Sequence, residues 1–176
     1  MKNGLLTLSC LVAVGLATAA CGTAARKSSA ALPPAPAPTQ LAAQANSEPS
    51  TRDMAARAIP ELKEIHFDYD KAALGASARA TLQANADWLK KNPDQLVQVA
   101  GHCDQRGTTE YNLALGQRRA KAVRDYYVML GIPGSRVSTI SYGKERPLCR
   151  ESTESCWSAN RRAETLGLVP NTLTSR

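Results

Sequence analysis

Residues 96–142 read LVQVAGHCDQRGTTEYNLALGQRRAKAVRDYYVMLGIPGSRVSTISY, and they set the order of strands and helices in this chain. Leu96–His102 is apolar and rich in β-favouring residues, which predicts a strand. Thr109–Leu130 has helical spacing of apolar residues and stops at Gly131, a usual helix terminator. Val137–Tyr142 alternates and predicts a second strand. The stretch therefore predicts strand, helix and strand in succession.

Three further elements are predicted outside this stretch. Glu64–Tyr69 is short and alternating, which predicts a strand that runs into a polar turn. Ser77–Lys91 predicts a helix with Ser77 as its N-cap. Arg161–Val169 supplies a fourth strand. The β-α-β-α-β-β order indicates an α/β fold of the two-layer α+β sandwich type, with a small mixed sheet and both helices on one face.

The aromatic residues show where the folded part of the chain lies. All eight Phe, Trp and Tyr residues of the 176-residue chain fall between Phe67 and Trp157. We therefore expect one domain over residues 61–169, followed by a frayed tail at 170–176. About 110 residues are too few for a TIM barrel, or for a dinucleotide-binding fold with a second domain.

Residues 1–20 have the plan of a secretory signal peptide, with a charged start, the apolar run Leu5–Leu16 and then small residues. The apolar run is too short to span a bilayer. Residues 16–21 resemble a bacterial lipobox, which predicts cleavage before Cys21 and lipid on that cysteine. Ordinary signal cleavage, without lipid, is the alternative. In lipoproteins of this type, a Gly such as Gly22 after the cysteine favours the outer membrane.

The segment that follows the lipobox is predicted to be a flexible tether over residues 21–60. Residues 22–60 contain twelve Ala and six Pro and no aromatic residue. Such a composition cannot bury enough apolar surface to offset chain entropy. The Pro-rich run Leu32–Pro38 favours a locally extended, semi-rigid spacer.

Three cysteines remain in the predicted exported domain. Cys149 and Cys156 enclose a short polar loop, Arg150–Ser155, and a disulfide between them is the natural pairing in an oxidising compartment. The alternative is two reduced cysteines in a flexible loop. Cys103 is adjacent to His102, but neighbours in an extended strand point to opposite faces, so we interpret Cys103 as a small core residue.

Arg119 is an anomaly within the predicted helix. It lies on the apolar face between Leu115 and Val123, where an unpaired charge would cost several kcal/mol. Arg119 must therefore extend to solvent, meet an internal Asp, or face a pocket that receives an anionic ligand. Arg118, Lys121 and Arg124 fall elsewhere on the helix and are interpreted as a solvated basic face.

Acidic residues gather in two turns that the fold could bring together. Asp68 and Asp70 follow the first predicted strand, and Asp104 follows the second, with Arg106 beside it. A carboxylate with two guanidiniums suits a zwitterionic ligand. The alternative is that Asp104 and Arg119 form a structural ion pair.

Five motifs stand out in the predicted domain. They are FDYD (67–70), GHCDQRGT (101–108), EYNLALGQRRA (110–120), SYGKERP (141–147) and NRR (160–162). Over about residues 60–168, their order and spacing closely resemble those of lipoproteins of the OmpA-like family.

The resemblance implies non-covalent binding of the peptide stem of peptidoglycan at its meso-diaminopimelate. By motif position, Asp104 takes the ammonium group of the ligand and Arg119 its carboxylate. The remaining contacts implied by the resemblance come from Phe67, Asp68, Asp70, Arg106 and Leu115. The family works with the Tol system, through a periplasmic β-propeller protein and other Tol proteins, in outer-membrane attachment and constriction at division. The expected location is the outer membrane, facing the periplasm, with acylated Cys21 in the lipid.

An enzyme is the first alternative, because His66-x-Asp68 and His102-x-Asp104 each place a His and an Asp on one face of a strand. These are the only two histidines, and the sequence contains no Gly-x-Ser-x-Gly, Walker or His-Glu-x-x-His motif. We therefore expect no catalysis, no cofactor and no metal.

The chain has a net charge of +7, yet its basic residues are scattered and the chain is exported, so nucleic acid is not an expected ligand. The serious alternative is an envelope lipoprotein that docks a partner protein without gripping peptidoglycan.

Overall fold

The computed structural model describes residues 48–170, all of which belong to one compact unit. The predicted signal peptide, Cys21, most of the tether and the tail from residue 171 lie outside the described residues. The elements in chain order are β1 (Met54–Ala58), β2 (Ile65–His66), α2 (Ala76–Lys91), β3 (Leu96–His102), α3 (Thr109–Met129), the 3-10 helix η1 (Gly134–Arg136), β4 (Val137–Gly143), α4 (Glu154–Asn160) and β5 (Arg162–Pro170). No helix in this range is long and apolar enough to cross a membrane.

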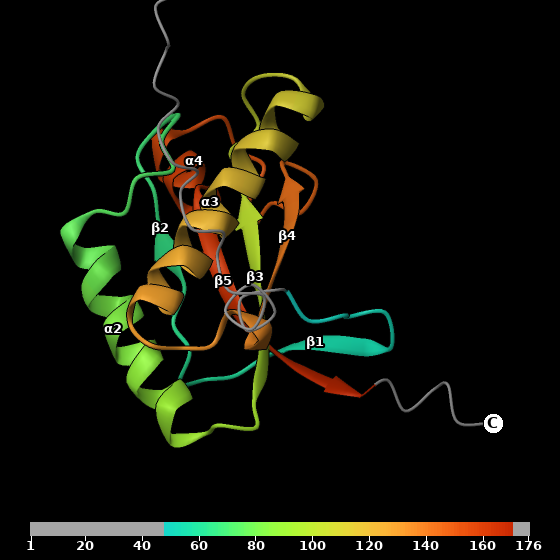
Figure 1. Ribbon diagram of the computed structural model, residues 1–176. Helices are drawn as coiled ribbons and strands as arrows, with labels where there is room; N and C mark the ends of the chain where they lie inside the picture. Colours follow the sequence, from blue (N-terminus) through green and yellow to red (C-terminus); the bar gives the residue numbers. More distant parts are fainter. Residues whose placement is uncertain (1–47, 171–176) are drawn as a thin grey trace, which may run out of the picture. The chain divides into compact units, whose positions relative to one another are not determined.

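The strands form one mixed sheet in the order β1-β5-β3-β4, with β2 also paired to β5 (Figure 1). β3 and β4 are parallel and α3 connects them, whereas β5 runs antiparallel to β3. In the central register, Val99 of β3 lies between Thr139 of β4 and Thr165 of β5. The predicted mixed sheet is therefore confirmed.

α2 and α3 pack on the same face of the sheet, as predicted. Their buried residues join those of β3 and β4 in a single apolar core, which contains Leu82, Ala86, Leu89, Val97, Val99, Ala120, Val123, Tyr127 and Val137. Tyr127, not Tyr126, is fully buried, and its hydroxyl lies 2.9 Å from Thr165 Oγ1. Tyr126 is only partly buried and packs against the core.

Two glycines bring α3 unusually close to β3. A Cβ on Gly101 would lie 1.9 Å from the carbonyl oxygen of Gly116, so only glycine fits at this crossing. The close approach places the following turn of α3, with Arg119, directly beside the end of β3.

β1 corrects the predicted tether, which extended to residue 60. Residues 54–58 pair antiparallel with β5, so that Ala56 lies opposite Leu168. The side chains of β1 are mostly exposed, and backbone hydrogen bonding to β5 holds the strand. Side-chain patterning therefore carried little signal for it.

Local chain geometry differs from the prediction at three points. β2 keeps only Ile65–His66 of the predicted strand, because the chain turns at Asp70, whose φ is +54°. α2 begins after Gly75 without a side-chain cap, so Ser77 is not its N-cap. The predicted loop after Cys149 contains the start of α4, where the hydroxyl of Thr153 accepts from Cys156 N at 3.3 Å.

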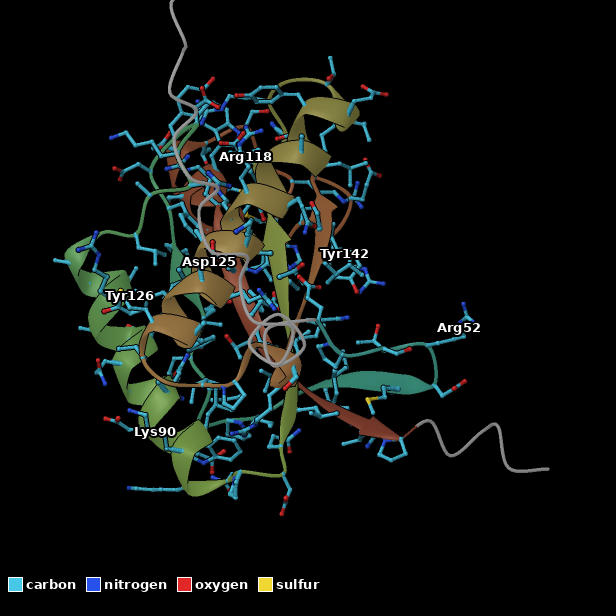
Figure 2. All side chains as sticks on the ribbon, viewed as in Figure 1. Arg52, Lys90, Arg118, Asp125, Tyr126 and Tyr142 are labelled. Atoms are coloured by element: carbon cyan, nitrogen blue, oxygen red, sulfur yellow. A yellow bond between two sulfur atoms is a disulfide. The ribbon has the colours of Figure 1, made fainter. Side chains whose placement is uncertain are left out.

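The basic residues of α3 do not all lie on a solvated face. Figure 2 shows Arg118 and Asp125 on the outer side of the helix, and Lys121 pairs with Asp125 at 2.6 Å. Arg124 is different, because it donates to the carbonyls of Val137 at 3.0 Å and Gly134 at 3.3 Å. The prediction of a solvated side chain is wrong for Arg124, which ties α3 to the start of β4.

Candidate functional site

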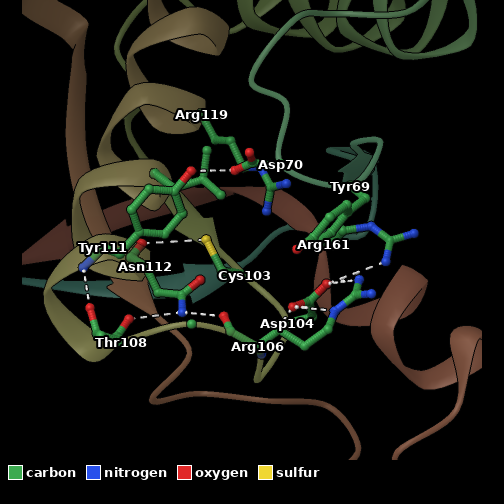
Figure 3. A pocket seen from close by; sticks show the side chains of 12 residues that line it. Tyr69, Asp70, Cys103, Asp104, Arg106, Thr108, Tyr111, Asn112, Arg119 and Arg161 are labelled. Carbon is green, nitrogen blue, oxygen red and sulfur yellow. Dashed lines mark hydrogen bonds and ion pairs between the residues drawn. The ribbon is translucent and has the colours of Figure 1, made fainter.

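A pocket of about 420 Å³ lies where the turns after β2 and β3 meet the first half of α3 (Figure 3). Parts of the chain far apart in sequence supply its walls. They are Tyr69, Asp70, Cys103, Asp104, Arg106, Gly107, Thr108, Tyr111, Asn112, Leu115, Arg119 and Arg161.

Arg119 lines this pocket although its solvent exposure is 0%. Its guanidinium donates to three backbone carbonyls: His102 at 2.7 Å, Lys71 at 2.9 Å and Asp68 at 3.1 Å. The ring of Phe67 lies 5.0 Å from the guanidinium carbon. Burial lowers the pKa of Arg119, but arginine stays protonated in proteins. The three carbonyls orient this charge, and no carboxylate in the described chain pairs with it.

Asp104 is also buried, with 4% exposure, and it pairs with other arginines. Its Oδ2 lies 2.6 Å from Arg106 Nη2 and 3.4 Å from Arg161 Nη1. Burial alone would raise the pKa of Asp104, but hydrogen bonds from Arg106 and Arg161 hold it below its usual value. The hypothesis of an ion pair between Asp104 and Arg119 is therefore wrong, and Asp104 is a carboxylate at neutral pH.

Arg106 forms part of the rim and is stacked between two aromatic rings. Its guanidinium carbon lies 4.0 Å from the ring centroid of Tyr69 and 4.2 Å from that of Trp157. The guanidinium edge remains directed at Asp104, whose Oδ1 also accepts from the Arg106 backbone N–H at 3.1 Å. Sequence reasoning placed Arg106 beside Asp104 but missed both aromatic partners.

Arg161 is the main site residue that sequence reasoning assigned no role. It lies between α4 and β5, where its Nε donates to Phe67 O at 3.1 Å and its Nη2 lies 2.6 Å from Glu154 Oε1. Through Glu154 and Asp104 it links the first turn of α4 to the pocket. Its one signal in the sequence was its place in the NRR motif.

The first turn of α3 forms the third wall. Thr108 caps the helix by accepting from Tyr111 N at 3.2 Å, and the Tyr111 hydroxyl donates to Asp70. Asn112 donates to Arg106 O at 2.7 Å, and its own carbonyl accepts from Cys103 Sγ at 3.3 Å. Hydrogen bonds therefore tie the helix to both turns of the pocket.

Five of the seven predicted binding residues line the pocket, namely Asp70, Asp104, Arg106, Leu115 and Arg119. Phe67 and Asp68 lie behind Arg119 instead and face it with a ring and a backbone carbonyl. The Asp68 carboxylate is exposed and pairs with Lys71 at 3.1 Å. The backbone groups of this segment that reach Arg119 are the carbonyls of Asp68 and Lys71.

The cysteines occupy two different environments. The structure contains a disulfide between Cys149 and Cys156, with their Cα atoms 5.7 Å apart. Cys103 is free and buried, as predicted, although it also borders the pocket. Burial raises the pKa of the Cys103 thiol, which keeps it protonated and a poor nucleophile.

The two His-x-Asp pairs do not come together as a metal site. In the described part of the chain, the one cluster of three potential ligands is Cys149, Glu151 and Cys156, and its two sulfurs are joined in the disulfide. His102 instead lies 3.6 Å from Glu164, and burial lowers the pKa of His102 to about 4. Its imidazole is therefore neutral at physiological pH.

Comparison with known proteins gives one family match. Residues 66–161 match the model of the OmpA family. The peptidoglycan-associated lipoprotein of Rhizobium meliloti (strain 1021) is 55% identical over 102 residues, which are 58% of this chain and 58% of that protein. The protein of the same name from Pseudomonas aeruginosa is 42% identical over 107 residues, 61% of this chain and 63% of that protein. The matches thus span under two thirds of the length of these relatives.

Solved structures give the same result for the fold. The crystal structure of the peptidoglycan-associated lipoprotein from Burkholderia pseudomallei is 39% identical, with a TM-score of 0.58 over 59% of this chain and 88% of that chain. The C-terminal domain of Helicobacter pylori MotB has a TM-score of 0.57 at 18% identity, over 63% of this chain and 87% of that chain, and shares the fold alone.

Proposed function

Because the chain belongs to the OmpA family, we propose that it is an envelope lipoprotein that binds peptidoglycan non-covalently, at the meso-diaminopimelate of the peptide stem. The names of its relatives support the association with peptidoglycan. The OmpA-like domain is a binding module and not an enzyme.

The buried charge of Arg119 at the pocket is the observation that carries this proposal. The guanidinium is oriented by neutral carbonyls, so its positive charge remains uncompensated by a carboxylate. Arginine has five N–H donors, and three of them go to these carbonyls. A ligand carboxylate at Arg119 would supply the missing negative charge in a site with little competing water.

The acidic residues of the pocket complete the fit to a zwitterion. The free end of diaminopimelate carries an ammonium and a carboxylate on one carbon atom. Asp104 is ionised and faces the pocket, and Asp70 lies on the opposite side of the view in Figure 3. We assign the ammonium to Asp104 and the carboxylate to Arg119, with Leu115 contacting the apolar part of the ligand.

The proposal also includes a lipid anchor at Cys21 and partner proteins in the cell envelope. The lipobox favours acylation of Cys21, and several acyl chains would hold the protein to a membrane. We place it at the outer membrane, facing the periplasm, with the Tol proteins as partners in envelope integrity and division. The Ala- and Pro-rich segment would let the domain reach the cell wall from the membrane.

Co-sedimentation with purified peptidoglycan that contains meso-diaminopimelate tests the proposal. The full chain in detergent is compared with Asp104→Asn and Arg119→Lys, which keep side-chain size or charge. Each has a matched control on the outer side of α3, namely Asp125→Asn and Arg118→Lys. Losing a buried charged contact costs about 2 to 5 kcal/mol, so both site variants should stay in the supernatant while both controls pellet.

The opposite result would favour the alternative function. If the wild-type chain itself stays in the supernatant, the protein is a lipoprotein that docks a partner and does not grip peptidoglycan. Should the folded site variants pellet like the wild type, peptidoglycan is bound elsewhere on the domain. Circular dichroism of every variant establishes that it is folded.

A further inference from the structure

The segment between β4 and β5 is tied to itself in several ways. The Cys149–Cys156 disulfide closes it, and α4 begins within the closed loop. The Asn160 side chain, at the end of α4, accepts from Leu148 N at 2.7 Å and donates to Cys149 O at 2.9 Å. Residues 148–160, here called the disulfide segment, therefore form one connected unit outside the sheet.

Trp157 of the disulfide segment packs against the turn that carries Asp104. The Arg106 guanidinium carbon lies 4.2 Å from the centroid of the Trp157 ring and 4.0 Å from that of the Tyr69 ring. In the amide orientation that satisfies its neighbours, Gln105 accepts from Trp157 Nε1 at 3.2 Å and from Ser152 Oγ at 2.8 Å. Two successive residues of the pocket turn thus contact the disulfide segment.

The end of α4 makes a second connection to the same carboxylate. Arg161 follows the helix, and its guanidinium bridges Glu154 of α4, at 2.6 Å, and Asp104, at 3.4 Å. Every charged partner of Asp104 is therefore held in place by a contact with the disulfide segment.

We propose that the disulfide segment is a positioning unit for the ligand site, with Trp157 as the residue that holds the Arg106 guanidinium in the plane in which it meets Asp104. The inference rests on the proposed function, because it concerns how that site is prepared for its ligand. Neither Trp157 nor the disulfide needs to touch the ligand.

Arg106 needs to be positioned because an arginine side chain at the edge of a pocket can adopt many conformations. The Arg106 side chain is 31% exposed, and a long side chain in that position has many rotamers. Contact with two rings restricts the guanidinium, and its Nη2 lies 2.6 Å from Asp104 Oδ2. The carboxylate is then oriented before the ligand arrives, which lowers the entropic cost of binding.

The disulfide is part of this unit because α4 has only seven residues. A helix of that length is not stable without tertiary support. Cys156 immediately precedes Trp157, so loss of the disulfide frees the helical turn that presents the indole ring. Removing the disulfide and removing the ring should therefore have the same consequence at Arg106.

A double-mutant cycle on the full chain in detergent tests this coupling. Affinity for soluble peptidoglycan fragments that contain meso-diaminopimelate is measured for Trp157→Leu, for Cys149→Ser with Cys156→Ser, and for all three changes together. Each of the first two should bind about tenfold more weakly, the size of one cation–π contact. The triple variant should bind no more weakly than either, because both changes release the same group.

Two further variants serve as controls. Trp157→Phe keeps an aromatic face and should restore most of the affinity. Trp88→Leu removes the other tryptophan, which packs against the core from α2, and should leave the affinity unchanged. Independent, additive losses in the cycle would overturn the proposal, and so would wild-type affinity of Trp157→Leu.

A spectroscopic readout separates this inference from the proposed function. In the ligand-free protein, the Arg106 Nε–H donates to Asp104 Oδ1 at 3.3 Å, and its nitrogen–proton NMR signal can be assigned with Arg106→Lys. That signal should shift in Trp157→Leu, and in Tyr69→Leu, whose parent side chain is 58% exposed and can be replaced without unfolding the domain. An unchanged signal in both variants refutes the positioning role. Failure of the wild-type chain to bind peptidoglycan refutes the proposed function instead.

Discussion

Two of the arginines that line the pocket, Arg119 and Arg106, carry the same charge but are held in different ways. Arg119 is fully buried and is oriented by three neutral carbonyls. Arg106 lies at the rim, stacked between rings and paired with Asp104. Carbonyls fix the direction of a guanidinium without cancelling its charge, whereas a carboxylate does both. Arg119 therefore keeps a positive charge available to a ligand, whereas Arg106 and Asp104 form an oriented ion pair whose charges nearly cancel.

Removal of the buried Arg119 charge should have the largest effect. Arg119→Met keeps an unbranched side chain but leaves three buried carbonyls without their donor. We expect unfolding free energy to fall by about 3 kcal/mol or more, because each unsatisfied buried group costs about 1 to 3 kcal/mol. Urea unfolding followed by circular dichroism measures the change. A loss below 1 kcal/mol would show that the carbonyls find other donors.

Removal of the Cys149–Cys156 disulfide should affect the Arg106 edge of the pocket and not the surroundings of Arg119. Cys149→Ser with Cys156→Ser should lower the unfolding free energy by about 2 to 3 kcal/mol, the chain-entropy value for so short a loop. The fold should remain, because the sheet does not depend on the segment that the disulfide closes. Urea unfolding of the oxidised wild type and the double variant gives the difference. Collapse of the far-ultraviolet signal in native buffer would contradict a local role.

Low pH should weaken the pairing of Arg106 with Asp104, because a carboxylate can be protonated, but not the contacts of Arg119 with backbone carbonyls. The folded-state pKa of Asp104 is lowered, so its stabilising contribution is complete above the unfolded value of about 3.9 and is lost as pH falls through the folded value. At pH 7, Asp104→Asn should cost about 1.5 kcal/mol through its charged hydrogen bonds, and this cost should shrink below pH 4. Unfolding experiments between pH 2 and 7 test this, and a cost that is independent of pH would contradict the assignment.

We expect the smallest effect from disrupting a surface ion pair, which serves as a reference for the other variants. Lys121 pairs with Asp125 at 2.6 Å on the exposed side of α3, far more exposed than either pocket arginine. Lys121→Ala should change the unfolding free energy by less than about 0.5 kcal/mol, with peptidoglycan binding unaltered. A larger effect in urea unfolding or in co-sedimentation would mean that the outer face of α3 takes part in binding.

Most of the fold could be predicted because its central elements have strong local patterns. β3, α3 and β4 match their predicted ranges to within one residue. β1 and α4 could not be found in this way. β1 is held by backbone pairing with a strand more than a hundred residues away, and α4 is one short helix supported by a disulfide and neighbouring side chains.

The candidate site also has one part that local patterns predicted and another that depends on contacts across the fold. The helical spacing of α3 was enough to place Arg119 on a buried face, and a pocket beside it was one of the three alternatives that this position left open. The spacing could not say which groups surround Arg119. By charge, Asp104 could have been the partner of Arg119, but in the folded protein Asp104 pairs with Arg106 and Arg161.

Local sequence patterns were sufficient for the order of the main elements, the buried position of Arg119 and the set of charged residues from which a pocket could be built. The folded structure was needed to establish how these charges pair, which rings contact Arg106 and that the disulfide segment supports the partners of Asp104. Periodicity along a chain reports which face of an element is buried, because that depends on near neighbours. The partner of a charge depends on contacts across the fold; Arg161 and Asp104 meet over 57 residues, and no local pattern encodes that meeting.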